Sequence, residues 1–251
     1  ASDVYKRQLY MIEVNPRASR TIPFLSKCIG ISLAKIASKV IAGKSLKDLG
    51  ITAEILPTSY AVKAPVFPFN KFRKVDPILG PEMKSTGEVM GRGKTFGEAF
   101  GKSMMGAGQL IPSEGNVFIS VKDEDKSQLK TLCTKLKGLG FKFIATKGTG
   151  LKMKEDGFDV KIINKVMEGR PHIVDAILNN EVSMVINTTE GRQSIKDSYS
   201  IRRSALEHSV FLTTTISGGF AIVESLEQGE KVWSYDACLL YTSPSPRDST
   251  L

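Results

Sequence analysis

The sequence predicts an α/β protein, in which a small doubly wound parallel-sheet domain follows a piece of another α/β domain. Three observations lead to this prediction. A hydrophobic content of 41% with 24% charged residues is ordinary for a globular chain. Glycines and a proline interrupt the pattern near residues 106–113. After this interruption strand and helix patterns alternate, which is typical of a parallel sheet with helices on both faces.

The first part of the chain, residues 9–105, contains few elements. A strand is predicted from Leu9 to about Arg17, and apolar residues at helical spacing predict a helix over 23–43. A short strand over 62–69 and a helix over 95–104 follow. Because these elements cannot close a domain by themselves, we expect the tail of a larger domain whose body lies upstream of residue 9.

The second part of the chain, residues 114–234, is predicted to be the doubly wound domain, with residues 106–113 as the linker before it. Its expected strands and helices alternate, the strands covering 117–121, 141–146, 184–187 and 210–215, and the helices 127–137, 172–179, 194–209 and 219–228.

The two ends of the chain, residues 1–8 and 235–251, resemble translated sequencing adapters. The codons GAT GTG TAT AAG AGA CAG, a transposon end used to prepare sequencing libraries, encode residues 3–8. Residues 238–248 resemble the reverse complement of that end read into its adapter. We therefore expect both ends to be artefacts and leave them out of fold reasoning, although a natural Ser/Pro-rich tail is the alternative.

The predicted strand at residues 9–17 carries candidate metal and phosphate ligands. Side chains alternate across a strand, so Glu13, Asn15 and Arg17 share one face, while Ile12 and Val14 are expected to point into a core. Carboxylate and amide oxygens are hard ligands for Mg²⁺, and a guanidinium suits phosphate oxygens. The alternative is an ordinary strand with a solvated polar face.

Polar residues also follow the predicted strands of the second domain, where ligands of parallel sheets bind. Thr146, Gly148, Thr149 and Gly150 supply hydroxyls and backbone N–H groups for a phosphate cradle. Asn187, Thr188 and Thr189 follow a later strand. Each motif alone is ambiguous. Gly/Thr turns after strands are more often plain connections than phosphate-binding loops. Lys165, a further candidate for phosphate binding, is equally explained as a solvated surface lysine.

Charge, cysteines and histidines limit the other classes of function. The net charge of +9 suits anionic small molecules, and the lysines are scattered without interleaved aromatics, so we expect no nucleic-acid partner. No apolar run is long enough to cross a bilayer, and we expect no membrane association. Cys28 and Cys133 are expected to be reduced and buried. His172 and His208 are expected at helix caps or on the surface, since neither forms a triad.

Several longer blocks resemble one family. Glu-x-Asn-Pro-Arg at residues 13–17 resembles the last metal-binding strand of an ATP-grasp ligase. Together with the residues that follow this segment, it resembles the C-terminal part of carbamoyl phosphate synthetase large chains. That part of the family ends in a methylglyoxal-synthase-like allosteric domain. The blocks that carry this resemblance are residues 68–72, 80–91, 164–166, 168–172, 186–189 and 201–206.

The resemblance implies site residues and partners. The family's metal ligands, for Mg²⁺ or Mn²⁺, fall on Glu13 and Asn15, and its phosphate-contacting catalytic arginine falls on Arg17. Its contacts to a nucleotide monophosphate effector such as UMP or IMP fall on Lys126, Thr146, Thr149, Lys165, Asn187 and Thr189, with Ser120 and Thr215 nearby. The whole enzyme is expected to be a cytoplasmic ligase that makes carbamoyl phosphate from ATP, bicarbonate and ammonia, for pyrimidine and arginine biosynthesis. A glutaminase small chain is expected to supply the ammonia. The fragment alone is expected to be inactive.

Two departures and two alternatives remain. Ala64 and Leu212 stand where ornithine-activated enzymes of the family have a glutamate and a tyrosine, so we expect no ornithine activation. A stand-alone regulatory nucleotide-binding module is one alternative, although Glu-x-Asn-Pro-Arg argues against it. A methylglyoxal synthase is the other; it needs a carboxylate for proton transfer, and Arg170 stands where that family has an aspartate.

Overall fold

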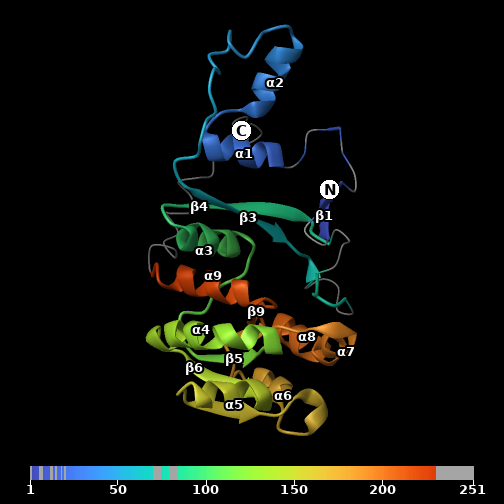
Figure 1. The fold of residues 1–251 in the computed structure, drawn as a ribbon, viewed down its shortest axis with the longest axis vertical. Coiled ribbons are helices and arrows are strands. Elements are labelled where there is room, and N and C mark those ends of the chain that lie inside the picture. The colour runs from blue at the N-terminus through green and yellow to red at the C-terminus, as the bar shows by residue number, and fades with distance from the viewer. Residues whose placement is uncertain are drawn as a thin grey trace, which may run out of the picture. The chain divides into compact units, whose positions relative to one another are not determined.

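The computed structural model describes residues 2–5, 8–11, 14, 16, 17, 19, 21–69, 75–79 and 84–229, with the backbone alone for 2–5, 8–11 and Arg192. The chain forms two compact units, residues 1–58 and 59–251 (Figure 1). This division falls before the linker predicted at 106–113, and the predicted domain limits stay predictions. The buried side chain of Ile111 shows that part of this segment belongs to the core of the second unit.

The first unit contains a strand pair and two helices. Its elements are β1 (Ser2–Tyr5), β2 (Gln8–Met11), α1 (Thr21–Ile29) and α2 (Leu33–Ile41). β2 pairs with β1, antiparallel, in a two-stranded sheet. The prediction that Val14 points into a core is wrong, since its side chain is 73% exposed and the residue lies outside any strand. A two-stranded pair offers no sheet face on which a longer strand would be buried.

The single helix predicted over 23–43 is also wrong, because two helices occupy this segment. Gly30 has a φ of +73°, a left-handed conformation that ends α1. Ser32 then caps α2, its hydroxyl accepting a hydrogen bond from the Lys35 N–H at 3.3 Å. The apolar spacing continues across both helices, and for this reason periodicity alone does not reveal the break.

The second unit contains the remaining elements. In chain order these are β3 (Tyr60–Val66), β4 (Gly87–Gly93), α3 (Phe96–Gly106), β5 (Asn116–Ser120), η2 (Asp123–Asp125), α4 (Lys126–Gly138), β6 (Lys142–Thr146), α5 (Lys147–Glu155), β7 (Val160–Ile163), η3 (Val166–Glu168), α6 (Ile173–Leu178), β8 (Met184–Asn187), α7 (Gly191–Asp197), α8 (Tyr199–Glu207), β9 (Phe211–Thr213) and α9 (Ile216–Leu226).

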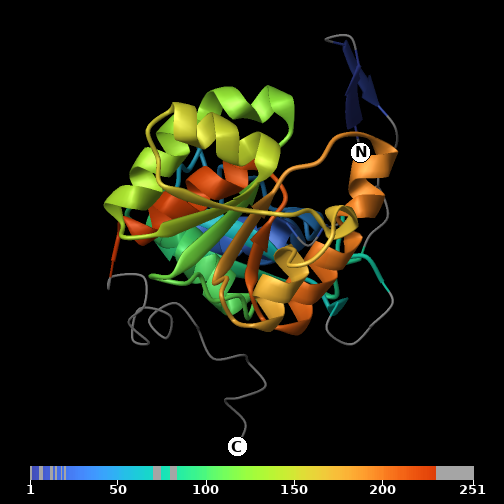
Figure 2. The ribbon, with the colours of Figure 1, turned by 90° about the horizontal axis from the view of Figure 1, so that it is seen from below.

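The predicted doubly wound parallel sheet is confirmed. Five parallel strands lie in the order β7-β6-β5-β8-β9, with helices on both faces (Figure 2). Alternate residues of β5 enter two separate cores: Val117 and Ile119 pack with α4 and α9, whereas Phe118 packs with α6 and α8. Both faces of the sheet are therefore buried, as near-continuous apolar strands indicate.

A second, antiparallel pair formed by β3 and β4 packs with α3, and α3 packs against α9. The two helices approach closely at Gly97, where an added Cβ would lie 2.5 Å from the Glu224 carbonyl carbon and 3.0 Å from the Ser225 nitrogen. Residues 59–106 thus share a compact unit with the parallel sheet.

The predicted pattern missed β4, α5 and β7, and it merged α7 with α8. β4 is rich in glycine, and β7 has only four residues, so neither gives a strong strand signal. α5 begins with two glycines in its first turn. α7 ends at Asp197, with Ser198 between it and α8, and the carbonyl of Ile195 in its last turn accepts a hydrogen bond at 2.8 Å from the Arg202 side chain.

Candidate functional site at the carboxyl edge of the sheet

The strand order creates a topological switch point at the carboxyl edge of the parallel sheet. The chain leaves the central strand β5 toward β6 and β7, then returns to the other side of β5 to form β8 and β9. The connections that follow β5 and β8 therefore run in opposite directions. Ligands of doubly wound sheets bind at this kind of switch point.

Three polar side chains from adjacent strands form the floor of this edge. Ser120 ends β5 and is in register with Asn187, which ends β8. On the other side, the Ser120 hydroxyl lies 3.1 Å from the Thr146 hydroxyl at the end of β6. Asn187 and Thr146 are 2% and 3% exposed. Among the residues that the structure describes, Asn187 Nδ2 is a buried donor with no hydrogen-bond partner, and such a group favours a polar ligand.

Backbone and side-chain hydrogen bonds hold the loops that follow these strands. Thr188 donates its N–H to the Ser120 carbonyl at 3.0 Å, and its hydroxyl accepts from the Lys122 N–H at 3.0 Å. The Thr149 hydroxyl accepts from the Val121 N–H at 3.1 Å. Sequence reasoning placed Thr188 among the polar residues of this edge but not among the effector contacts. The register of β5 with β8 is the signal that places it beside the end of β5.

The Thr-Lys-Gly-Thr-Gly segment is the first turn of a helix, not a loop. Thr146 is the N-cap of α5, with no hydrogen bond from its side chain to the helix N-terminus. A helix N-terminus of this kind presents free N–H groups and a partial positive charge to an anion. The Lys126 ammonium adds a full charge, since it lies 3.9 Å from the position that a Cβ would take on Gly148.

The lysines beside this switch point are paired with exposed carboxylates. Lys126 contacts Asp123 at 2.7 Å, and Lys122 contacts Glu124 at 2.6 Å. The hydrogen bond from Lys126 lowers the pKa of Asp123, and the hydrogen bond to Glu124 raises the pKa of Lys122. Because Asp123 and Glu124 are 92% and 69% exposed, water can replace either lysine at little cost. Both lysines are thus available to an incoming anion.

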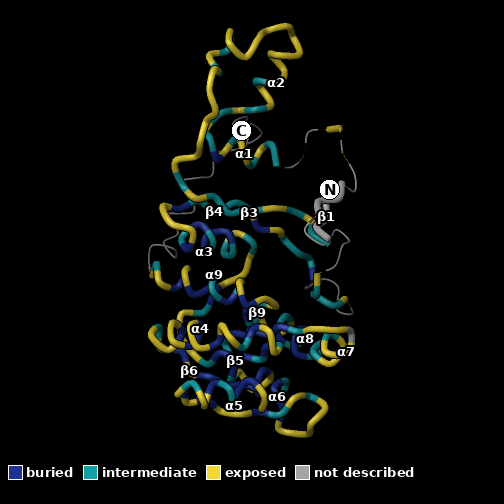
Figure 3. The backbone as a smooth tube through the Cα atoms, viewed as in Figure 1, coloured by how far each residue is buried: buried dark blue, intermediate teal, exposed yellow. Residues whose placement is uncertain are grey.

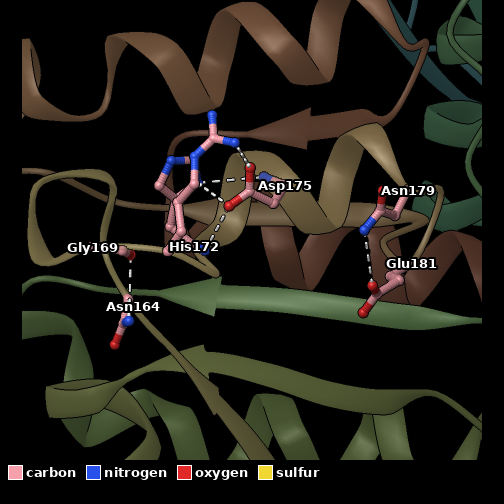
Figure 4. Close-up of polar contacts among 7 residues, drawn as sticks. Asn164, Gly169, His172, Asp175, Asn179 and Glu181 are labelled. Atoms are coloured by element: carbon pink, nitrogen blue, oxygen red, sulfur yellow. Dashed lines mark hydrogen bonds and ion pairs between the residues drawn. The ribbon is translucent and has the colours of Figure 1, made fainter.

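Lys165 comes from the loop that follows the edge strand β7, and its side chain is exposed. The loop is closed on itself: Asn164 Nδ2 donates to the Gly169 carbonyl at 3.3 Å (Figure 4). The Lys165 N–H also donates to the Glu168 carboxylate at 2.9 Å. Because β7 is parallel to β6, Lys165 lies at the same edge as Thr146. Thr189 is half-buried directly after β8, and Thr215 caps α9 at the far end of the edge.

His172 and Asp175 form a reciprocal cap on α6 (Figure 4). The His172 N–H donates to the Asp175 carboxylate at 3.0 Å, and the Asp175 N–H donates to His172 Nδ1 at 3.4 Å. His208 is exposed, with Nδ1 3.0 Å from the Ser204 carbonyl. The capping and surface positions predicted for the histidines are therefore confirmed. Asp175, an aspartate near Arg170, is held in this cap and not free as a base.

Cys28 and Cys133 are both buried, as predicted. Desolvation raises the pKa of the Cys133 thiol to about 12, so this thiol stays protonated.

A cavity of about 260 Å³ lies between β7 and α6, lined by residues such as Asn164, Asp175 and Glu181. None of the predicted effector residues lines it, and we therefore place the candidate site at the sheet edge.

The predicted metal ligands Glu13 and Asn15 lie outside the described residues, and Arg17 is exposed. Within the described ranges, no three His, Cys, Asp or Glu side chains gather as a metal site would require.

The two positions that depart from ornithine-activated enzymes lie in strands: Ala64 is buried in β3, and Leu212 is half-buried in β9. No helix in the described part of the chain has the length and apolar character needed to cross a membrane.

Comparisons with known proteins agree with this architecture. Residues 128–214 match the MGS-like domain, and residues 1–49 match the ATP-binding domain of the carbamoyl-phosphate synthase L chain. The chain is similar to the carbamoyl phosphate synthase large chain of Pseudomonas putida, with 61% identity over 222 residues, which is 88% of this chain and 21% of that protein. It is 53% identical over 219 residues to the one from Xanthomonas axonopodis pv. citri, or 87% of this chain and 20% of that protein. The chain thus spans about a fifth of the length of these relatives.

Proposed function

We propose that this chain, a homologue of one fifth of the carbamoyl phosphate synthase large chain that carries an MGS-like domain, binds a nucleotide monophosphate as a regulatory effector. The observation that supports this most is the floor of the sheet edge. There Ser120, Thr146 and Asn187 are buried or half-buried polar groups at adjacent strand ends, and Asn187 carries a donor with no partner in the described structure. Such a floor suits a ligand with many polar atoms.

The phosphate group would be bound from two directions. The free N–H groups of α5 lie next to Thr146, and Lys126 lies beside the same helix turn. Lys165 supplies a second exposed cation from the neighbouring strand end. One helix N-terminus and two lysines match the two negative charges of a phosphate monoester better than a neutral nucleoside. Asn187 and Thr189, on the β8 side, would then contact the sugar.

We also propose the activity of the whole enzyme, which is supported by the homology and by the Glu-x-Asn-Pro-Arg segment. We place the chain in an ATP-dependent ligase of the cytoplasm that makes carbamoyl phosphate and draws ammonia from a glutaminase small chain. Glu13 and Asn15 would hold Mg²⁺ or Mn²⁺, and Arg17 would contact phosphate. A bound metal supplies charge neutralisation between phosphate groups. The fragment, which lacks most of the relatives' length, is expected to be inactive.

Thermal denaturation of the whole chain with nucleotides tests the effector site. We expect UMP or IMP at a hundredfold excess over its dissociation constant to stabilise the second unit by about 2.7 kcal/mol, a rise of several degrees in the melting midpoint. Uridine or inosine should have almost no effect, because the lysines and the α5 N-terminus would find no phosphate. The substitution Lys165→Ala should remove most of the rise, since a hydrogen bond to a charged group contributes about 1.5–3 kcal/mol.

Lys137→Ala is the matched control, because Lys137 is an exposed lysine near the end of α4, away from the sheet's carboxyl edge. It should leave the nucleotide effect intact. An unmodified chain that neither UMP nor IMP stabilises, or equal losses from the two lysine substitutions, would show that no effector site lies at this edge.

A further inference from the structure

A buried arginine joins two segments of the second unit that lie far apart in sequence. Arg202 on α8 is 1% exposed, and it donates from Nε and Nη2 to the two carboxylate oxygens of Asp76 at 2.9 and 2.5 Å. Asp76 lies in the segment between β3 and β4, and its side chain is 26% exposed. A guanidinium removed from water needs such a partner, so the carboxylate and α8 are held together.

The same nitrogen of Arg202 also contacts the helix that follows the candidate effector site. Nη2 donates to the Ile195 carbonyl on α7 at 2.8 Å as well as to Asp76. α7 begins at Gly191, directly after the Asn187–Glu190 segment at the sheet edge. One donor group is thus shared between the effector-side helix and the β3–β4 segment.

The segment around Asp76 is itself ordered by this carboxylate. The Ile78 N–H donates to Asp76 Oδ1 at 3.0 Å, and the Lys84 ammonium donates to the Ile78 carbonyl at 3.1 Å. The hydrogen bonds from Arg202 and Ile78 lower the pKa of Asp76 in spite of its partial burial, so it is charged at neutral pH. A change in the Arg202 bond therefore reaches the backbone of Ile78.

α8 itself is fixed to the sheet. Ile201 and Ala205, which flank Arg202 on the helix, are buried in the core formed with β5, β6 and β8. Motion at the sheet edge would then appear in α7 relative to α8, and the Arg202 side chain on α8 contacts α7 through the Ile195 carbonyl. The next residue, Arg203, contacts the Phe69 carbonyl at 3.5 Å and adds a second link from α8 to the β3–β4 segment.

We infer that Arg202 is a positioning residue that couples nucleotide binding at the sheet edge to the order of the Asp76–Ile78 turn. This inference rests on the proposed function. A nucleotide that contacts Thr189 would order the start of α7, and the Ile195 carbonyl would then hold Arg202 Nη2 in place against Asp76. Coupling is reciprocal, so an intact Asp76–Arg202 pair raises nucleotide affinity by the factor with which the nucleotide stabilises the turn.

Backbone hydrogen exchange at Ile78, with and without saturating UMP or IMP, tests the coupling. In the unmodified chain the nucleotide should slow exchange of this amide about tenfold, within the 5–150-fold range usual for coupled sites. Asp76→Asn keeps the shape but removes the charge, and Arg202→Lys keeps the charge but loses the paired donors. Either substitution should abolish the slowing and weaken nucleotide affinity about tenfold, although neither residue belongs to the proposed phosphate site.

Glu88→Gln is the control, because it removes an ion pair of Glu88 with Lys63 at 3.4 Å on the β3–β4 pair that does not involve α8. It should leave both readouts unchanged. A merely structural pair would lower the melting midpoint of the Asp76 and Arg202 variants but leave nucleotide affinity and the exchange response intact, and this result overturns the inference alone. If the unmodified chain binds no nucleotide, the proposed function falls, and the inference falls with it.

Discussion

The helices of the two compact units differ in what covers their apolar faces. α4 in the second unit buries Leu129, Leu132, Cys133 and Leu136 completely against the parallel sheet. α2 in the first unit has the same helical spacing of apolar residues but no buried residue (Figure 3). Its Ile41 is 87% exposed. The comparison teaches that periodicity predicts a helix and its apolar face, whereas burial requires a partner surface in the same compact unit.

The largest effect that tests this comparison comes from matched leucine substitutions. Leu132→Ala should destabilise the second unit by about 2–5 kcal/mol, because Leu132 is fully buried and the substitution leaves a cavity. Leu33→Ala in α2 should cost less than about 1 kcal/mol, because Leu33 is only half-buried. Urea denaturation followed by circular dichroism measures both. Equal losses would show that α2 is packed as fully as α4.

A smaller effect tests whether residues 59–106 belong with the parallel sheet. Gly97→Ala places a methyl group against the Glu224 carbonyl, so α3 and α9 must separate, at a cost of about 1–3 kcal/mol. Gly138→Ala, also in a helix, is the control: a Cβ there meets nothing within 4 Å, and the substitution should stabilise by a few tenths of a kcal/mol or more. Thermal melting of the two variants should move in opposite directions. A neutral Gly97→Ala would mean that the α3–α9 contact is loose.

The smallest effect concerns acid. The pKa of Asp76 is lowered in the folded chain, so its ion pair stabilises the second unit above the unfolded pKa of about 3.9 and is lost as the pH falls through the folded value. Asp76→Asn should therefore lower the melting midpoint at pH 7, and the difference from the unmodified chain should shrink below pH ~4. Asp48→Asn in the first unit should matter less, because Asp48 is exposed and its carboxylate accepts hydrogen bonds from the neutral Ser45. A difference that stays constant down to pH ~2 would exclude the ionic contribution of Asp76.

The parallel sheet was predictable from the sequence because its strands and helices carry regular apolar patterns. The gathering of Thr146 and Asn187 was predictable as well, since parallel strands end at one edge. α5 and β7 were missed for local reasons, as glycines weaken the first turn of α5 and β7 is only four residues long. The contact between Arg202 and Asp76 could not be predicted, because both residues are polar and stand 126 positions apart. Polar residues are usually exposed, and only the tertiary fold brings these two together as a pair.

The contact of α3 with α9 has a consequence for the growing chain on the ribosome. α3 is made early in the second unit, and α9 is the last helix described in it. At about 5–20 residues per second, the residues between the two helices take several seconds to synthesise. During this time the face of α3 around Gly97 has no native partner. Such late, long-range closure slows folding and leaves apolar surface open to aggregation or to chaperones until α9 emerges.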